Sequence, residues 1–63
     1  MWLMDLEKAV KALRENEETR YYIFENVTPC FDGGIVFKTT HHTYVKWFPS
    51  GEIKENKKDD WRK

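Results

Sequence analysis

The sequence lacks the features that usually reinforce a small protein or carry it into a membrane. Cys30 is the only cysteine among 63 residues, so no disulfide can form within one chain. A lone thiol is typical of a reducing compartment, which indicates a cytoplasmic protein. The apolar opening at residues 1–4 is interrupted by Asp5 and Glu7, so we expect neither a signal peptide nor a membrane-spanning helix.

The chain also has no net charge at pH 7, with histidine counted as neutral. The chain carries 11 basic and 11 acidic residues, and neither sign dominates a long segment. Proteins that bind nucleic acids usually carry a basic footprint, since contacts to phosphates supply most of their affinity. Gly33-Gly34 is not followed by the lysine that a phosphate-binding loop needs. A chain this short has few residues left to organise a catalytic site, so we expect no enzyme and no cofactor.

The first segment of the chain has a helical pattern. Its apolar residues recur at intervals of three or four positions: Leu3, Leu6, Val10 and Leu13. Such spacing predicts an amphipathic helix over 5–16. The carboxylate of Asp5 is placed to accept backbone N–H groups of the first turn as an N-cap, and Asn16 is expected to end the helix in the left-handed conformation.

Aromatic and β-branched residues then replace the helical spacing. They predict four short strands separated by turn residues such as Pro29 and Gly51, at 20–27, 35–39, 43–48 and 52–55. We therefore expect an α+β domain over 1–55, in which the amphipathic helix packs on a three- to four-stranded antiparallel β-meander as two layers. Residues 56–63 are expected to form a frayed, charged C-terminal tail.

The number of aromatic residues exceeds what a core of this size can hold. Ten of 63 residues are Phe, Trp or Tyr. A helix covers only one face of a sheet, and alternation along the strands groups Ile23, Ile35, Phe37, Val45 and Trp47 on one face. We take that face as the covered one; a shift of one residue in the register of a strand would exchange the two sets. The opposite face then carries an aromatic patch with a lysine at its rim, formed by Tyr22, Phe24, Tyr44, Lys46 and Phe48.

Exposed aromatic residues are typical of protein interfaces. The leading hypothesis is therefore a small non-enzymatic protein-interaction module that binds a larger protein or a second copy of itself. Accessory factors of phages and mobile elements are often of this size and act as regulators or inhibitors of a larger protein. Further apolar residues add to the surplus: Trp2, Met4, Phe31 and Trp61.

A second hypothesis is a single-stranded nucleic-acid-binding protein. Lysines and aromatic residues alternate along two neighbouring predicted strands, at Lys38, Tyr44, Lys46, Trp47 and Phe48. Such a surface can stack unpaired bases while the lysines meet phosphates. The neutral net charge counts against this interpretation.

Two adjacent histidines suggest a third interpretation. His41 and His42 with Cys30 do not form a metal site at recognisable spacing, and adjacent residues of an extended chain point to opposite sides. The segment 40–44, Thr-His-His-Thr-Tyr, resembles the Ser-His-His-x-Phe stretch of HicA-type ribonuclease toxins. The resemblance implies a general acid/base role for His41 on RNA. The chain departs from that family by its additional strand at 20–27, its missing closing helix and its neutral charge.

Overall fold

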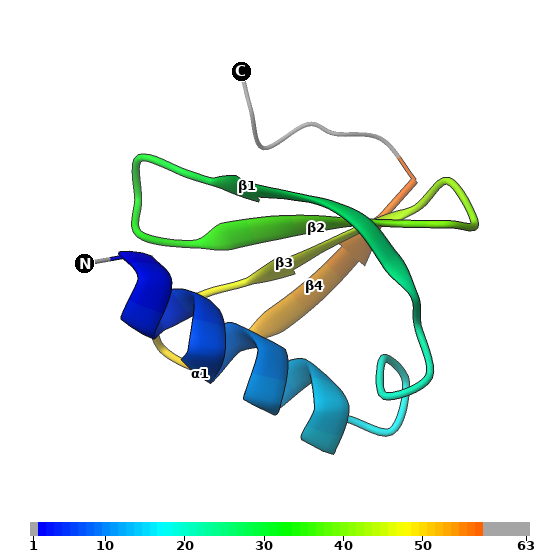
Figure 1. The fold of residues 1–63 in the computed structure, drawn as a ribbon, viewed down its shortest axis with the longest axis horizontal. Coiled ribbons are helices and arrows are strands. Elements are labelled where there is room, and N and C mark those ends of the chain that lie inside the picture. The colour runs from blue at the N-terminus through cyan, green and yellow to red at the C-terminus, as the bar shows by residue number, and fades with distance from the viewer. Residues whose placement is uncertain (1, 58–63) are drawn as a thin grey trace.

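The computed structural model describes the backbone of residues 2–57 and the side chains of residues 5–57. One helix precedes four strands in chain order: α1 (Trp2–Glu15), β1 (Phe24–Pro29), β2 (Ile35–Thr39), β3 (Tyr44–Trp47) and β4 (Ile53–Asn56). The strands form one antiparallel sheet in the order β1-β2-β3-β4, and α1 lies across one face of it (Figure 1). The predicted α+β architecture, a helix on a β-meander, is confirmed. Of the predicted tail at 56–63, residues 58–63 lie outside the described residues.

Helix α1 begins three residues before the predicted start. Asp5 therefore lies inside the first turn rather than at the N-cap, where its negative charge still favours the positive end of the helix dipole. The helix ends at Glu15, and the carbonyl of Asn16 accepts the backbone N–H groups of Thr19 and Arg20. The left-handed stop predicted at Asn16 is wrong, because the chain turns through these two bonds instead.

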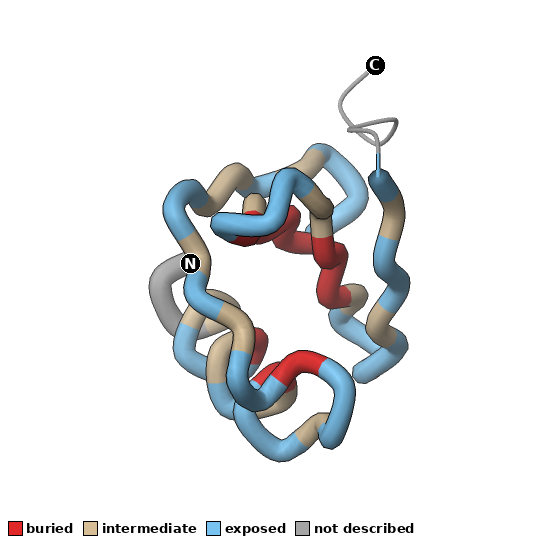
Figure 2. Tube along the Cα trace, turned by 90° about the vertical axis from the view of Figure 1, so that its right-hand side faces the viewer, coloured by how far each residue is buried: buried red, intermediate tan, exposed pale blue. Residues whose placement is uncertain are grey.

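The core lies between α1 and the face of the sheet that we call the inner face. Its buried members are Ala9 and Leu13 from the helix and Ile35, Phe37, Val45 and Trp47 from the two central strands. In Figure 2 the buried parts of the helix and of the sheet face one another across the interior. The sequence assigned all four of these strand residues to the covered face, and that assignment is confirmed.

Strand β1 differs from its prediction. It spans 24–29 instead of 20–27, because the carbonyls that precede it are bound elsewhere. The Arg14 guanidinium, at the end of α1, donates from Nη1 to the carbonyl oxygens of Arg20 (2.9 Å) and Tyr22 (3.0 Å). These carbonyls are held by the helix, so residues 20–23 form a connector between α1 and β1.

The shift exchanges two side chains between the faces of the sheet. Phe24 packs on the inner face, with its ring centroid 5.0 Å from that of Phe37. Ile23, which was expected on the inner face, is largely exposed. An extra residue in β1 at Glu25 also interrupts the pairing with β2, since Phe24 lies opposite Thr39 and Asn26 opposite Lys38. A displacement of one residue moves a side chain to the other face, and this is what separates the prediction from the structure.

The three hairpins share one design. In each, the first residue of the loop accepts a backbone N–H from the third residue after it and donates its own N–H to the fourth, over the loops 30–34, 39–43 and 48–52. This is a type I turn followed by one residue in the left-handed region. That residue is Gly33 (φ 88°), His42 (φ 65°) and Gly51 (φ 98°) in turn. The middle hairpin therefore places a histidine where the other two have glycine.

We expect His42→Gly to stabilise the fold. The left-handed conformation costs a residue with a side chain roughly 1–2 kcal/mol, while glycine loses about 0.5–1 kcal/mol more backbone entropy on folding. The net gain is therefore about 0.5–1 kcal/mol in the free energy of unfolding, measured by urea denaturation. His41→Gly is the matched control, because residue 41 has no positive φ and should gain nothing. Equal effects at 41 and 42 would contradict this account of the turn.

The exchange of Ile23 and Phe24 changes the expected cost of truncating aromatic residues. Phe37→Ala empties the centre of the core and should cost about 3–5 kcal/mol in the free energy of unfolding. Phe24→Ala removes a half-buried ring that packs on Phe37 and should cost about 2 kcal/mol. Phe31→Ala, at a fully exposed position, is the control and should change stability by less than about 0.5 kcal/mol. Thermal melts of the three variants give the order directly, and a Phe24→Ala melt equal to that of Phe31→Ala would contradict it.

Candidate functional site

The structure divides the five predicted binding residues between two places. Tyr44, Lys46 and Phe48 follow one another at alternate positions of β3 and on into its turn, so they lie on the face of the sheet opposite α1, which we call the outer face. Tyr22 and Phe24 instead pack against the inner-face core. The predicted five-residue aromatic patch is therefore not one surface.

The contacts of Tyr22 and Phe24 are those of structural residues. The Tyr22 hydroxyl donates to Oε2 of Glu55 in β4 at 3.0 Å, which ties the connector to the far edge of the sheet. This hydrogen bond to a carboxylate is the main cause that raises the pKa of Tyr22 above its usual value. The guanidinium of Arg14 lies 5.5 Å from the centroid of the Phe24 ring. Both aromatic residues thus anchor the connector to the helix and the sheet.

Lys46 is the most unusual residue of the outer face. It was predicted at the rim of a patch, yet only 3% of its surface is exposed. Its Nζ donates to Oδ2 of Asp32 at 2.7 Å, and Oδ1 of Asp32 accepts the backbone N–H of Gly34 at 2.9 Å. A buried lysine needs such a partner, because an unpaired charge out of water is costly. The β1–β2 hairpin thus closes over the central strand through one ion pair.

Gly34 leaves the space that Lys46 occupies. A Cβ at position 34 would lie 2.6 Å from Cε of Lys46 and 3.0 Å from the backbone oxygen of Trp47. The Lys46 side chain therefore passes position 34 on its way to Asp32, and any residue with a Cβ at position 34 would collide with it. Beyond it, the Lys46 Nζ lies 4.8 Å from the centroid of the Phe48 ring, and the Lys54 Nζ lies 5.8 Å from the same centroid. Phe48 is thus flanked by two ammonium groups on the outer face.

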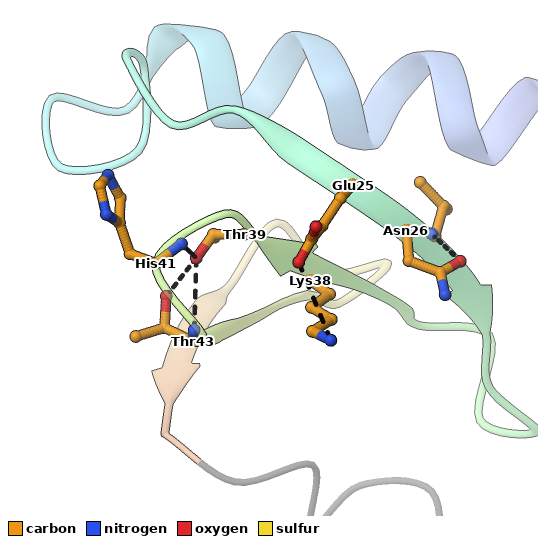
Figure 3. A network of polar contacts seen from close by, with 7 residues as sticks. Glu25, Asn26, Lys38, Thr39, His41 and Thr43 are labelled. Carbon is orange, nitrogen blue, oxygen red and sulfur yellow. Dashed lines mark hydrogen bonds and ion pairs between the residues drawn. The ribbon is translucent and has the colours of Figure 1, made fainter.

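A second lysine of the outer face, Lys38, is also paired. Nζ of Lys38 lies 3.8 Å from Oε1 of Glu25, as Figure 3 shows. Lys54 lies directly opposite Lys46 in the register of β3 and β4, and no ion pair involves it among the described residues. Within residues 5–57 the outer face therefore presents two half-buried aromatic rings, Tyr44 and Phe48, and one lysine without an ion pair, Lys54.

A second surface carries the most exposed apolar residues. The exposed fractions are 84% for Tyr21, 67% for Ile23 and 114% for Phe31. Tyr21 and Ile23 lie in the connector before β1, and Phe31 lies at the tip of the hairpin after β1. We call these three residues the β1-side surface. The sequence did not indicate that Tyr21 and Ile23 are exposed. The exposure of Phe31 could be inferred, because the segment Cys-Phe-Asp-Gly-Gly is typical of a turn that ends at glycine.

The backbone beneath the β1-side surface is held in place. Arg14 binds the carbonyls on either side of Tyr21, and the carbonyl of Ile23 accepts the backbone N–H of Thr40 at 3.0 Å. The guanidinium of Arg20 lies 5.8 Å from the centroid of the Tyr21 ring. Tyr21 and Ile23 therefore project from a connector whose backbone is hydrogen-bonded to the helix and the β2–β3 turn, and a partner that binds them has little of that backbone to order.

The two histidines lie in the β2–β3 turn and are exposed. The backbone N–H of His41 donates to Oγ1 of Thr39 at 3.2 Å, and the two threonine hydroxyls, Thr39 and Thr43, lie 2.7 Å apart. Figure 3 shows the imidazole of His41 pointing away from both threonines. Among residues 2–57 no hydrogen bond orients that imidazole, whereas a general acid/base is usually fixed by a second group. No cluster of three or more metal-ligating side chains occurs in the described part of the chain.

We expect Asp32→Asn to destabilise the fold through Lys46. Asparagine keeps a carbonyl oxygen for the N–H of Gly34 but removes the charge that faces the buried ammonium group, at a cost of about 1–2 kcal/mol. Glu25→Gln is the matched control, since the Lys38–Glu25 pair is exposed and should contribute less than about 0.5 kcal/mol. Urea unfolding at pH 7 measures both, and equal losses would show that the burial of Lys46 has no energetic consequence.

The Asp32–Lys46 pair also predicts how the destabilisation by Asp32→Asn depends on pH. The hydrogen bond from Lys46, followed by the one from Gly34, lowers the pKa of Asp32 below its usual value. A group with a lowered folded-state pKa contributes stability that is present above its unfolded pKa, about 3.9, and lost as pH falls through the folded value. The difference in unfolding free energy between the wild type and Asp32→Asn should therefore be full at pH 6 and shrink toward pH 2. A difference that stays constant over this range would contradict the assignment.

Comparison with known proteins identifies no family for this chain. No helix within residues 2–57 is long and apolar enough to cross a membrane. The chain matches no protein-family model, and no curated protein or solved structure is significantly similar to it.

Proposed function

We propose that this protein is a non-enzymatic protein-interaction module that docks a larger partner on the β1-side surface. The observation that carries the proposal is the exposure of Tyr21 and Ile23 on a connector whose carbonyls are bound by Arg14 and Thr40, together with the exposure of Phe31 at the tip of the closed β1–β2 hairpin. A role as an accessory factor that modulates its partner, of the kind found in phages and mobile elements, agrees with this design.

The energetic argument rests on burial. Removing a large apolar side chain fully from water is worth about 1.5–3 kcal/mol, so Tyr21 with Ile23 at the connector and Phe31 at the hairpin tip supply two anchor points for a partner. Strand β1 has six residues, so at about 3.3 Å per residue the connector and the hairpin tip are separated by roughly 20 Å. A protein interface of standard size spans that distance, whereas a small ligand does not.

The partner contacts side chains here rather than adding a strand to β1. Asn26 and Thr28 of β1 bond to β2, and Cys30 after it bonds to Gly34, so Val27 and Pro29 direct their backbone groups outward. The N–H of Val27 donates to Oδ1 of Asn26 at 2.8 Å, and proline has no N–H. This stretch of the β1 edge therefore offers no backbone donor, which is a usual protection of edge strands.

A second candidate function is the binding of single-stranded nucleic acid on the outer face. The specific observation in its favour is Lys54, which lies beside Phe48 and has no ion-pair partner among the described residues. A base stacked on Phe48 would bring a phosphate within reach of this lysine. The commitment of Lys46 to Asp32 and of Lys38 to Glu25 reduces the charge that is available for phosphates.

One capture experiment tests the proposal and its alternative. The tagged wild type, Tyr21→Ala/Phe31→Ala and Phe48→Ala/Lys54→Ala are used to capture binding partners from a host extract, followed by titration with the purified partner. We expect the first double variant to bind about 30-fold more weakly or worse, since aromatic hot spots contribute 2 kcal/mol or more. The outer-face variant should bind normally. The Tyr21→Ala/Phe31→Ala variant should melt close to the wild type because both side chains are exposed, and a melt of the Phe48→Ala/Lys54→Ala variant confirms that it is folded at the temperature of the binding assay.

The opposite pattern would overturn the proposal. Normal binding by Tyr21→Ala/Phe31→Ala together with loss of the partner in the outer-face variant would move the site to the outer face. Capture of nuclease-sensitive material that depends on Phe48 and Lys54 would favour the nucleic-acid function. Its affinity should then fall with rising salt concentration.

A further inference from the structure

The two edges of the sheet differ in what their backbone offers. The hairpin before β4 closes with the N–H of Phe48 donating to the carbonyl of Glu52 at 2.8 Å. Alternation then makes residues 52, 54 and 56 bond to β3, while Ile53 and Glu55 direct their backbone groups away from the sheet. In Figure 2 the segment that leads to β4 and through it runs along one margin, with no other described segment beyond it.

The β4 edge is a complete hydrogen-bonding edge, in contrast to β1. Ile53 and Glu55 each present one outward N–H and one outward C=O, and no hydrogen bond of residues 2–57 from outside the sheet engages them. Strand β4 contains no proline and pairs with β3 without a bulge. Such an edge is a template for another strand.

We propose that a second copy of this chain pairs with β4 in an antiparallel arrangement around a two-fold axis at Ile53. The two sheets then join edge to edge, with both helices on the same side. The pair of Ile53 residues exchanges two backbone hydrogen bonds at the axis, which are the backbone bonds of this contact, because Glu55 then lies opposite Gly51 of the second copy, whose N–H already donates to the carbonyl of Phe48. Because Ile53 already packs against the inner-face core, its side chain extends that core toward its symmetry mate. This surface lies on the opposite edge from the β1-side surface, so the two interactions are independent.

Charge complementarity selects this register. Pairing that keeps the faces of the two sheets aligned allows axes at residue 53, 54 or 55. An axis at 54 places Lys54 opposite Lys54 of the second copy, and an axis at 55 places Glu55 opposite Glu55. An axis at 53 places Lys54 opposite Glu52 of the second copy, twice by symmetry, on the outer face. Opposite charges stabilise a cross-strand pair, and like charges destabilise it.

The same geometry limits the assembly to two chains. A head-to-tail filament would need β1 of one copy to pair with β4 of the next. The outward donors of β1 at Val27 and Pro29 are occupied or missing, so that contact lacks half of its ladder. The contact around Ile53 uses the same edge from both copies and closes on itself.

A charge-exchange experiment tests the dimer and its register. Sedimentation equilibrium of the untagged full chain should show the wild-type mass rising with concentration toward that of two chains. Glu52→Lys and Lys54→Glu each replace both unlike pairs by like pairs, and each should raise the dissociation constant about tenfold or more. The double variant Glu52→Lys/Lys54→Glu restores both pairs and should associate like the wild type.

An equimolar mixture of the two single variants should also dimerise, because each lysine then faces a glutamate on the other chain. Lys11→Glu, at an exposed position of α1, is the control for the change in net charge and should leave the dimer intact. A wild type that stays monomeric at high concentration would overturn the proposal, including the case in which a different protein occupies this edge. A dimer that the single variants leave unchanged, or that neither the double variant nor the mixture restores, would overturn the register and with it the role of Ile53.

Discussion

Each hairpin of this sheet is closed by one residue in the left-handed region, and the positions of these residues decide what every strand residue faces. With Gly33, His42 and Gly51 in place, the closing hydrogen bonds determine which backbone groups pair with which neighbour. The same alternation sends Ile35, Phe37, Val45 and Trp47 to the helix. One local conformational requirement, repeated three times, thus sets the core, the outer face and the two edges together.

A single helix can cover only one face of a four-stranded sheet, so the outer face needs its own means of excluding water. Here the β1–β2 hairpin supplies it: Asp32 reaches Nζ of Lys46, and the lysine stem occupies the space that Gly34 leaves. Val36, next to Lys46 in the register, is buried as a result on the face without a helix. In place of a second helical layer the outer face has one ion pair, between a buried lysine and a half-exposed aspartate.

Prediction from sequence succeeded where the residue pattern is locally unambiguous. Residues 35–39 and 43–48 are short, rich in β-branched and aromatic residues and bounded by turn residues, so their strands and the grouping of their side chains by alternate position follow from the sequence. The segment Tyr-Tyr-Ile-Phe has no alternation of apolar and polar side chains, because all four residues are apolar or aromatic. Its register is decided by Arg14, which binds the carbonyls of residues 20 and 22 from the helix. Local sequence patterns do not predict this tertiary contact. They do not predict the burial of Lys46 either, because it depends on Asp32 in another part of the chain.

The error in the predicted register of β1 also explains why the residues of the predicted site lie on two different faces. A pattern of aromatic residues predicts an excess of apolar surface but not which members of it face water, since neighbouring residues in a strand face opposite ways. The structure uses Tyr22 and Phe24 to hold the connector and exposes Tyr21 and Ile23 in their place. An exposed apolar pair that alternates with an anchored one is what a fixed binding surface requires, because the buried members hold the exposed members rigid. The aromatic excess is thus divided between anchoring the connector and facing solvent, and the division follows from the contacts of Arg14.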